Sequence, residues 1–525
     1  MKGIVKRTLT SAAVAALVVS PLANATNGYF TIGAGSKNRG MAGAGIAFGQ
    51  DSLAGAINPA SLAGISTRTD FGVELFKPKR KGEVDARGLD TNNVPPAFRP
   101  PGYTPLAGAD SSEKSRSNAF FLPHFGIAKV WSSKVTLGLS VIGVGGMNTR
   151  YGDANGGNGN IYSDAFAPAI GNCSDGTQCP QPTPPFPPLN SGFAGLVEAQ
   201  LQQPPPAGAG LTPGQAAGVV GGNLFSLFTN PNNTPALGVN LAQALITPTI
   251  AFRVTPTQSI GFSPVIGYQT FRAYGLGLFQ GFSSDPGKVT NNGNDDSWGY
   301  GAQIGYKGDF GMFSIGAMAR SKIYMDKFSK YSGLFAEGGD FDIPAYFGVG
   351  VAAHVTSGLT IAVDVNRILY GGVDSISNKG PTADEFFNAM GGVLASNPAA
   401  ISNPLGSNNG WGFGWNDVWV YKVGVNYAYD NNWTFRAGFN YSPTPYNDSQ
   451  ALFNVLAPAV VEKHVTAGFT RSLTPNSEIT VAYMYAFRND VENTYQGTGN
   501  NAAFSFTAKN DMYQNALEVS YGLKF

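Results

Sequence analysis

Charged side chains are scarce in this 525-residue chain. Asp, Glu, Lys and Arg together make up 13% of it, about half of the usual share near 25%. A soluble protein of this length would have difficulty covering its surface with so few charges, whereas a membrane barrel exposes much of its outer face to lipid. The formal net charge of +1 also argues against a nucleic-acid partner.

Long hydrophobic runs are missing after the N-terminus. No stretch beyond the first 25 residues approaches the roughly 18 apolar residues of a membrane helix. Those first residues form a predicted secretory signal peptide, in which basic residues precede a short apolar stretch and Ala23-Asn24-Ala25 forms a cleavage site. We expect the mature chain to begin at Thr26 and to be exported without a helical anchor.

Cysteine is nearly absent. Cys173 and Cys179 lie in a stretch rich in Pro, Gly and Asn. In an oxidising compartment such a pair usually forms a disulfide, which we predict here. A metal site is the alternative, but no third or fourth ligand lies nearby in the sequence. Neither a metal nor a cofactor is predicted.

Histidine is also rare, with only His124, His354 and His464. His124 and Ser140 fall on neighbouring predicted strands with the same facing, so a barrel lipase is an alternative. A serine hydrolase also needs an orienting carboxylate and oxyanion donors, and the sequence has no local nucleophile motif. We predict that the chain is not an enzyme.

What the chain does have is alternation. Fourteen segments show the period of two that is typical of strands, and tight turns and long connections separate them in turn. This pattern predicts an all-β transmembrane fold, a 14-stranded antiparallel up-and-down β-barrel, whose even strand count allows closure. The long connections span about 151–245 and 370–417. The predicted strands are 69–78, 118–130, 135–150, 246–255, 258–272, 298–307, 311–327, 344–355, 359–369, 418–428, 432–441, 461–471, 477–488 and 511–525.

The last predicted strand shows the alternation clearly. Its odd-numbered residues from Tyr513 to Phe525 are nearly all apolar, and its even-numbered residues are small or polar. A soluble β-sandwich with one buried face is the alternative, but it does not explain outward aromatic residues on strand after strand with so few charges. A terminal aromatic residue is typical of barrels in the Gram-negative outer membrane, so we expect Phe525 to contact the barrel-assembly machinery.

The residues before the first strand do not alternate. Residues 26–66 are rich in Gly, Ala and Ser, and glycine allows close backbone packing. We predict that this stretch forms a hatch, or plug, in the lumen of a barrel made by residues 67–525.

This N-terminal stretch contains several distinctive motifs. They are Thr26-Asn27-Gly28-Tyr29-Phe30, Gly40-Met41-Ala42-Gly43-Ala44-Gly45, Asp51 and Asn58-Pro59-Ala60. Together they resemble the start of the FadL/TodX family of outer-membrane transporters for long-chain fatty acids and hydrophobic compounds. Beyond residue 66 the resemblance is architectural and rests on the strand count and the terminal Phe.

The resemblance implies a mechanism. A hydrophobic small molecule would land on apolar extracellular loops and move passively to a pocket near the N-terminus. After hatch movement it would leave sideways where the third strand kinks inward, so that the lipid bilayer and lipopolysaccharide are expected partners. The third predicted strand contains Gly143, Gly145 and Gly146, and glycine permits a bulge or bend. Alternatively, these glycines only make room for the plug.

The long connections contain apolar clusters. Residues 193–197 and 224–228 form two apolar islands, and residues 385–394 predict a short amphipathic helix. Exposed apolar clusters usually contact an apolar ligand or a partner. We interpret these clusters either as a capture surface or as loops that pack on one another.

The substrate class stays open at this point. A fatty acid needs a cation for its carboxylate, and Lys422, Arg436 and Arg488 have lumen-facing parity. Lumen carboxylates such as Glu518 or Asp364 are the alternative partners of these cations. An aromatic or aliphatic hydrocarbon needs no cation. A general porin should show charged ladders in its lumen, which the lumen-facing positions lack.

Overall fold

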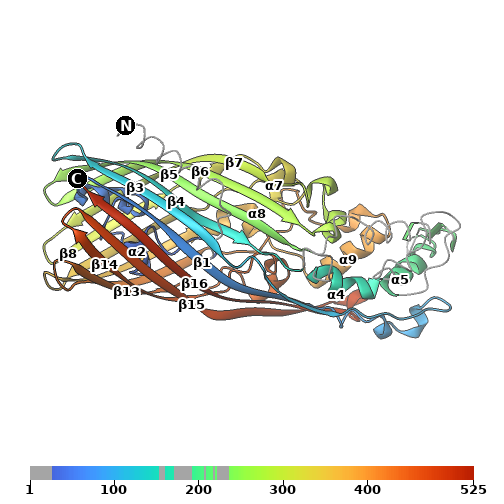
Figure 1. Ribbon diagram of the computed structural model, residues 1–525. Coiled ribbons are helices and arrows are strands. Elements are labelled where there is room, and N and C mark those ends of the chain that lie inside the picture. Colours follow the sequence, from blue (N-terminus) through green and yellow to red (C-terminus); the bar gives the residue numbers. More distant parts are fainter. Residues whose placement is uncertain are drawn as a thin grey trace, which may run out of the picture.

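A closed β-barrel forms the body of the molecule (Figure 1). The computed structural model describes residues 27–152, 160–170, 192–205, 209–213, 215–216, 219–220 and 236–525. Within these residues, fourteen antiparallel strands form the wall, and β16 pairs with β1 from Arg68↔Lys524 to Asp85↔Thr507 to close it. The wall strands are β1 (Arg68–Asp85), β3 (Phe120–Val130), β4 (Val135–Asn148), β5 (Gly238–Thr255), β6 (Gln258–Tyr274), β7 (Asp295–Asp309), β8 (Phe313–Arg320), β10 (Ala345–His354), β11 (Leu359–Leu369), β12 (Val418–Ala428), β13 (Trp433–Tyr441), β14 (Lys463–Thr474), β15 (Ser477–Gln496) and β16 (Ser505–Lys524).

The strand number and the facing of the side chains agree with the sequence pattern. Each wall strand overlaps one predicted segment, so the 14-stranded barrel is confirmed. On β16, Leu517 is 45% exposed on the outer face, whereas Glu518 is fully buried on the inner one. Some bounds differ: β5 already begins at Gly238, and β15 and β16 form a longer hairpin that reaches Gln496 and Ser505.

The loop end of the barrel holds most of the remaining elements (Figure 1). β2 (Asp110–Lys114) pairs with β1, and β9 (Tyr324–Met325) pairs with β7. No helix of the described residues is long and apolar enough to cross a membrane. The helices of the loop end are α4 (Ile161–Ile170), α5 (Gly192–Leu201), α7 (Ala336–Gly339), α8 (Asp374–Ser377), α9 (Ala383–Leu394) and α10 (Ala451–Asn454), and the 3-10 turn η4 (Gly277–Phe282) lies beside them.

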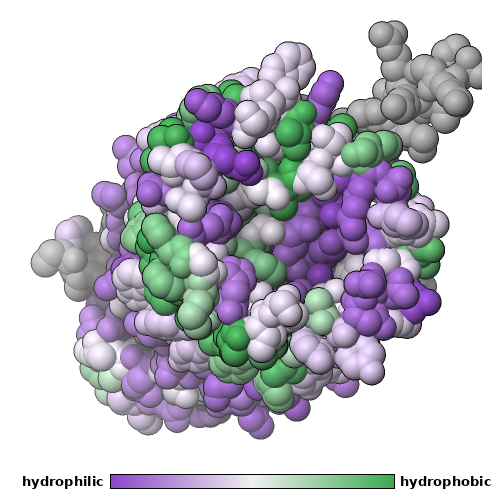
Figure 2. Space-filling model, turned by 90° about the vertical axis from the view of Figure 1, so that its left-hand side faces the viewer, coloured by the Kyte–Doolittle hydropathy of each residue, from purple (hydrophilic) through white to green (hydrophobic). Residues whose placement is uncertain are grey.

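The opposite end carries the tight turns and the C-terminus (Figure 1). Phe525 is 75% exposed there, and its amide hydrogen is donated to the Thr67 carbonyl at 3.0 Å. Seen from this end, the molecule is hollowed, and hydrophilic residues gather around the hollow (Figure 2). Short turns face the periplasm in outer-membrane barrels and long loops face outward, which sets the orientation of the chain.

Residues 27–66, called here the N-terminal segment, pack inside the wall. The segment contains α2 (Ser36–Arg39), α3 (Ala54–Ile57) and the 3-10 helix η1 (Pro59–Gly64). Its backbone approaches the wall closely where two glycines face each other on adjacent strands. Such pairs are Gly261↔Gly305 against Pro59 and Asn58, Gly316↔Gly350 against Ile46, and Gly424↔Gly438 against Met41.

Candidate functional site

The first described residues are held in the barrel interior by aromatic side chains. Tyr29 is fully buried and Phe30 is 6% exposed. The Tyr370 hydroxyl donates to the Asn27 carbonyl at 2.5 Å, and the rings of Tyr29 and Trp415 lie 5.7 Å apart. Gly28 has a φ of +68°, and a Cβ there would lie 2.3 Å from the Tyr370 hydroxyl. The predicted motif 27–30 is therefore a tight, enclosed turn.

The pairing between β3 and β4 stops partway along the wall. Residue pairs run from Val130↔Thr136 to Phe125↔Val141. β3 stays paired with β1 as far as Phe76↔Phe120, but no pair joins its residues 120–124 to residues 142–148 of β4, although both strands lie in the described range 27–152. We call this stretch the β3–β4 break. Pro123, which has no N–H to donate, lies on its β3 side.

β4 turns inward at the break and pairs with the N-terminal segment instead. Its register with β5 shifts between Gly143 and Gly145, so Val144 is a bulge, and a bulge bends a strand. Thr31 donates its amide hydrogen to the Val144 carbonyl at 3.0 Å, and Phe30 bridges Gly145. Residues 144–149 are all buried, on both strand faces. This stretch therefore lies in the interior.

Arg80 closes the break on its loop side. Its Nη1 donates to the Asn148 carbonyl at 2.5 Å and to the Ser117 carbonyl at 3.2 Å, and so joins both rims. Arg80 is 3% exposed, and its Nη2 has no hydrogen-bond partner. No carboxylate of the described residues forms an ion pair with it. A buried guanidinium without an anion is unusual, because buried charges are normally paired.

A small cavity lies beside Arg80. It is too narrow to hold a water molecule, and we call it the lumen cavity. Its other walls combine the turn at residues 27–30, the end of β4, Trp415 and the segment before β14. They are Tyr29, Met147, Asn148, Trp415, Ala457, Pro458 and Ala459. The Asn148 side-chain oxygen also has no partner, so the cavity is mostly apolar with a polar corner at Arg80 and Asn148.

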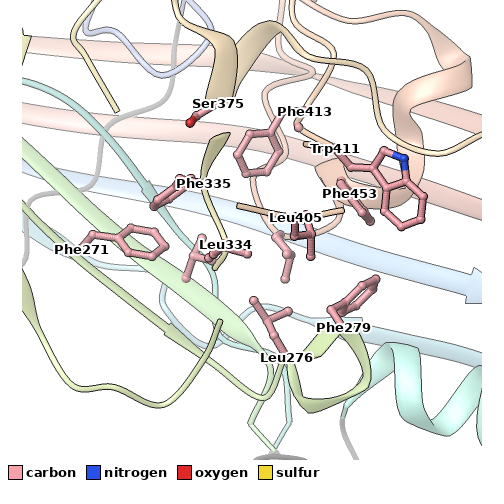
Figure 3. A pocket seen from close by; sticks show the side chains of 13 residues that line it. Phe271, Leu276, Phe279, Leu334, Phe335, Ser375, Leu405, Trp411, Phe413 and Phe453 are labelled. Atoms are coloured by element: carbon pink, nitrogen blue, oxygen red, sulfur yellow. The ribbon is translucent and has the colours of Figure 1, made fainter. Parts of the chain in front are cut away.

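A larger, apolar cavity lies among the extracellular loops (Figure 3). Its volume is about 40 Å³ and it is partly open to solvent, and we call it the loop cavity. The Ser375 hydroxyl, one of its few polar groups, already donates to the Asp340 carbonyl. The lining residues are Val239, Phe271, Leu276, Phe279, Leu334, Phe335, Ser375, Leu405, Trp411, Gly412, Phe413, Phe453 and Leu456.

The two cavities are neighbours along the same chain segments. Trp411 and Phe413 line the loop cavity and Trp415 lines the lumen cavity. Likewise, Phe453 and Leu456 line the loop cavity, and residues 457–459 that follow them line the lumen cavity. A row of rings also connects them, because Phe335 lies 4.8 Å from Phe341 and Phe341 lies 6.4 Å from Tyr29.

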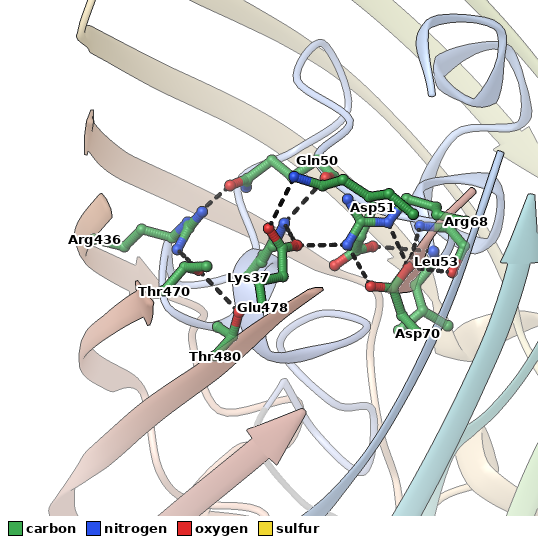
Figure 4. Close-up of polar contacts among 12 residues, drawn as sticks. Lys37, Gln50, Asp51, Leu53, Arg68, Asp70, Arg436, Thr470, Glu478 and Thr480 are labelled. Carbon is green, nitrogen blue, oxygen red and sulfur yellow. Dashed lines mark hydrogen bonds and ion pairs between the residues drawn. The ribbon is translucent and has the colours of Figure 1, made fainter. Parts of the chain in front are cut away.

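Buried ion pairs hold the N-terminal segment against the wall near the periplasmic end (Figure 4). Lys37 pairs with Glu478, which also accepts from Arg68 at 2.5 Å. Asp70 accepts from the Ser52 amide at 3.0 Å. Nearby, Arg39 contacts Glu74 at 3.0 Å and Glu518 at 2.5 Å. These contacts connect the segment to β1, β15 and β16.

Asn58-Pro59-Ala60 serves as an anchor to the wall. Asn58 caps η1 by accepting from the Ala60 amide at 3.1 Å. Its Nδ2 donates to the carbonyls of Ile46 at 2.8 Å and Tyr306 at 3.0 Å. None of the three residues lines either cavity.

The predicted cations do not line the cavities either. Lys422 lies across from Asp364 on the neighbouring strand, and its Nζ donates to the Gly43 carbonyl at 3.5 Å. Arg436 donates to Gln50 at 2.8 Å and to Thr470 at 2.7 Å, and its binding of a substrate carboxylate stays a prediction.

Arg488 does not face the lumen, contrary to its predicted parity. Its side chain is 68% exposed and pairs with Asp511 at 2.6 Å. The register between β15 and β16 shifts between Ala486 and Asn489, which reverses the alternation at this point. Thr26, Cys173 and Cys179 lie outside the described residues.

His124 and Ser140 do not form a catalytic pair. His124 contacts Glu518 at 3.2 Å, and the Ser140 hydroxyl donates to the Ser52 carbonyl at 3.5 Å. Both side chains therefore face the N-terminal segment and the ion pairs around it.

The apolar loop clusters pack on one another in the described residues. The predicted helix is present as α9, with Thr382 and Glu385 forming a capping box. Phe193 of α5 lies 5.6 Å from Phe504, and Phe387 of α9 lies 5.7 Å from the same ring. Residues 224–228 lie outside the described part of the chain.

A closed barrel, an occupied lumen and a strand that turns inward define an outer-membrane transport barrel. The model of the family described as outer membrane protein transport protein (OMPP1/FadL/TodX) matches residues 231–523. The chain belongs to this family, and it is a transport protein of the outer membrane rather than an enzyme. No curated protein sequence matches it significantly.

Solved structures show the same fold. The toluene transporter TodX of Pseudomonas putida has a TM-score of 0.55 and 14% identity over 94% of this chain and 99% of its own. A FadL homologue of Pseudomonas aeruginosa has a TM-score of 0.55 and 15% identity over 95% of this chain and 100% of its own. The toluene transporter TbuX of Ralstonia pickettii has a TM-score of 0.50 and 15% identity over 94% and 99%. At these identities the likeness concerns the fold alone.

Proposed function

We propose that this protein takes up hydrophobic carboxylic acids, long-chain fatty acids above all, by passive diffusion across the outer membrane. The acyl chain enters the loop cavity and passes along residues 411–415 to the lumen cavity. There the carboxylate binds Arg80, for which the turn at Tyr29 has to move aside. The substrate then leaves sideways into the membrane through the β3–β4 break, after the N-terminal segment has moved.

The unpaired Nη2 of Arg80 is the observation that supports an acid. This guanidinium is buried, faces an apolar cavity and lacks a carboxylate partner among the described residues. A carboxylate is the anion that its fork of donors fits. Because Arg80 also joins the two rims through Ser117 and Asn148, a bound carboxylate would compete for the donors that hold the break closed.

Uptake of uncharged hydrocarbons is the second candidate. The loop cavity is lined mostly by aromatic and aliphatic side chains, and two proteins with the same fold are described as toluene transporters. Such a substrate would not use the guanidinium of Arg80.

Ligand binding to Arg80 variants separates these candidates. We would titrate oleate and toluene into purified wild type, Arg80→Met and Arg80→Lys, and follow tryptophan fluorescence. A hydrogen bond to a charged group contributes about 1.5–3 kcal/mol. The oleate Kd should therefore rise roughly 10- to 100-fold in Arg80→Met, less in Arg80→Lys, and the toluene Kd should stay unchanged.

Lys422→Met is the matched control, because Lys422 is a buried lumen cation that lines neither cavity. It should bind oleate like the wild type. Unchanged oleate binding in Arg80→Met would contradict the acid proposal, and equal losses of oleate and toluene would mean that Arg80 only maintains the cavity.

A further inference from the structure

The outer face of β1 changes abruptly from apolar to basic. Phe71 and Val73 are 49% and 42% exposed to lipid, and Leu75 follows on the same face. The next three residues of that face are Lys77, Lys79 and Lys81. Leu75 pairs with Phe121, which is 61% exposed and ends the apolar band on β3.

A fourth lysine extends this row across the sheet. Lys114 of β2 lies directly opposite Lys81 of β1. Directly opposed residues in an antiparallel pair share a face, with Cβ atoms about 4.5–5.5 Å apart, and like charges there repel. We call Lys77, Lys79, Lys81 and Lys114 the lysine patch.

Carboxylates neutralise only one lysine of the patch within the described residues. Glu83 pairs with Lys81 at 2.8 Å. Asp511 lies opposite Lys81 on β16 but pairs with Arg488 at 2.6 Å. Lys77, Lys79 and Lys114 form no ion pair with any residue that the structure describes. Three positive charges of the patch therefore have no counter-charge within the described part of the chain.

The height of the lysine patch above the apolar band can be compared with the thickness of the lipid headgroup layer. A strand rises about 3.4 Å per residue and is tilted by about 40° in such barrels. Lys77 and Lys79 therefore lie about 5 and 10 Å above the last apolar pair. The polar headgroup layer is about 5–8 Å thick on each side of the hydrocarbon core, so Lys77 lies within it and Lys79 just above it. On the other side of the barrel the outer face at the loop end is aromatic instead, with Phe347, Trp419 and Tyr421 each 40–48% exposed.

We propose that the lysine patch binds the phosphates of a phosphorylated lipid of the outer leaflet, with its acyl chains against Phe71, Val73 and Phe121. The patch lies on β1 and β2, and β1 is paired with β3, one rim of the β3–β4 break. The lipid would thus sit beside the break. This inference does not depend on the nature of the transported substrate.

A lipid-binding assay on the full-length protein tests it. The wild type and the triple variant Lys77→Gln/Lys79→Gln/Lys114→Gln would be placed in phosphatidylcholine nanodiscs. Diphosphoryl lipid A, and the same lipid without its phosphates, would be titrated in and counted by native mass spectrometry. Each lysine near an anionic lipid contributes roughly fivefold in affinity, so the triple variant should lose on the order of 100-fold for diphosphoryl lipid A.

The control variant Lys288→Gln/Lys327→Gln/Lys330→Gln removes the same number of positive charges from the extracellular loops. It should bind diphosphoryl lipid A like the wild type. Dephosphorylated lipid should bind weakly to all three proteins. Equal affinity in both triple variants would overturn the proposal. So would displacement of lipid A by an equal concentration of inorganic phosphate or of oleate, because the site would then recognise a free anion or the transported acid.

Discussion

Gly146 donates its amide hydrogen to the Tyr29 carbonyl at 3.2 Å, so the turn at residues 27–30, called here the N-terminal turn, occupies the edge of β4 that β3 leaves free. A free strand edge in a membrane barrel exposes unsatisfied backbone groups, which is costly in lipid. The N-terminal turn therefore completes part of the sheet as well as filling the lumen. Movement of this turn would expose the β4 edge.

Gly145→Ala should loosen the N-terminal turn. An added Cβ would lie 2.8 Å from Tyr29 Cδ2 and 3.0 Å from the Tyr29 carbonyl oxygen, so the turn must shift away from β4. We expect hydrogen exchange of the Thr31 amide, which is bonded to Val144, to accelerate on the order of tenfold as local opening becomes easier. Gly372→Ala adds a Cβ into open space and should leave the exchange unchanged. If the Thr31 amide of Gly145→Ala exchanged at the wild-type rate, the close contact between Gly145 and Tyr29 would not be what holds the turn.

Arg39→Met should destabilise the protein strongly. The substitution leaves Glu74 and Glu518 buried together without their shared cation. Loss of one partner from a buried ion pair costs about 3–5 kcal/mol, which denaturant unfolding in lipid vesicles would measure. The additional changes Glu74→Gln and Glu518→Gln should restore part of this stability.

The surface pair Lys307–Asp309 provides the comparison for Arg39→Met. Its atoms lie 2.5 Å apart, and its exposure comes from Asp309, whose side chain is 52% exposed, against 14% for Lys307. Exposed ion pairs contribute up to about 1 kcal/mol, so Lys307→Met should change the free energy of unfolding by no more than this. Similar losses in both variants would mean that the Arg39 cluster does not anchor the N-terminal segment.

Gly261→Ala should unseat η1 from the wall. The new Cβ would lie 2.3 Å from the backbone carbon of Pro59, a clash that no rotamer change can relieve. We expect a higher ion conductance in planar bilayers than for the wild type, because the lumen loses part of its filling. Gly64→Ala lies in the same 3-10 helix with open space around its Cβ and should conduct like the wild type. Equal conductance of all three proteins would speak against the lumen being blocked by this segment.

Local patterns in the sequence predicted the fourteen wall strands and which face of each meets lipid. The period-two pattern sufficed because lipid and lumen impose opposite polarity on every strand. It failed at Arg488, where a register shift between Ala486 and Asn489 reverses the facing. A bulge adds one or more residues without changing the composition of the strand, so the pattern does not reveal it.

The parts of the site that depend on distant contacts were not predictable. Arg80 lies in the basic run from Lys77 to Lys81, beyond the end of the predicted strand 69–78, and its burial depends on Ser117, Asn148 and the lumen cavity. Its even number, shared with the inward-facing residues of β1, was the one indication in the sequence that its side chain lies on the inner face. The glycines at 143, 145 and 146 indicated a bend in the third strand, but the end of its pairing with β3 is a property of both strands and of the N-terminal turn.

Deletion of Val144 should block lateral exit while the barrel stays closed. Val144 is the extra residue between the pairs Gly143↔Ala244 and Gly145↔Gln243, so its removal makes the β4–β5 register continuous and takes away the cause of the bend. A straight β4 could then pair with residues 120–124 of β3. We expect uptake of a fluorescent fatty acid by whole cells to fall on the order of tenfold or more, as the barrier to exit rises by at least about 1.4 kcal/mol. Deletion of Val254, which removes a similar one-residue shift between Arg253 and Thr255 near the periplasmic end, should leave uptake intact. Wild-type uptake by the Val144 deletion, with the protein folded and inserted, would mean that the substrate leaves the barrel by another way than the β3–β4 break.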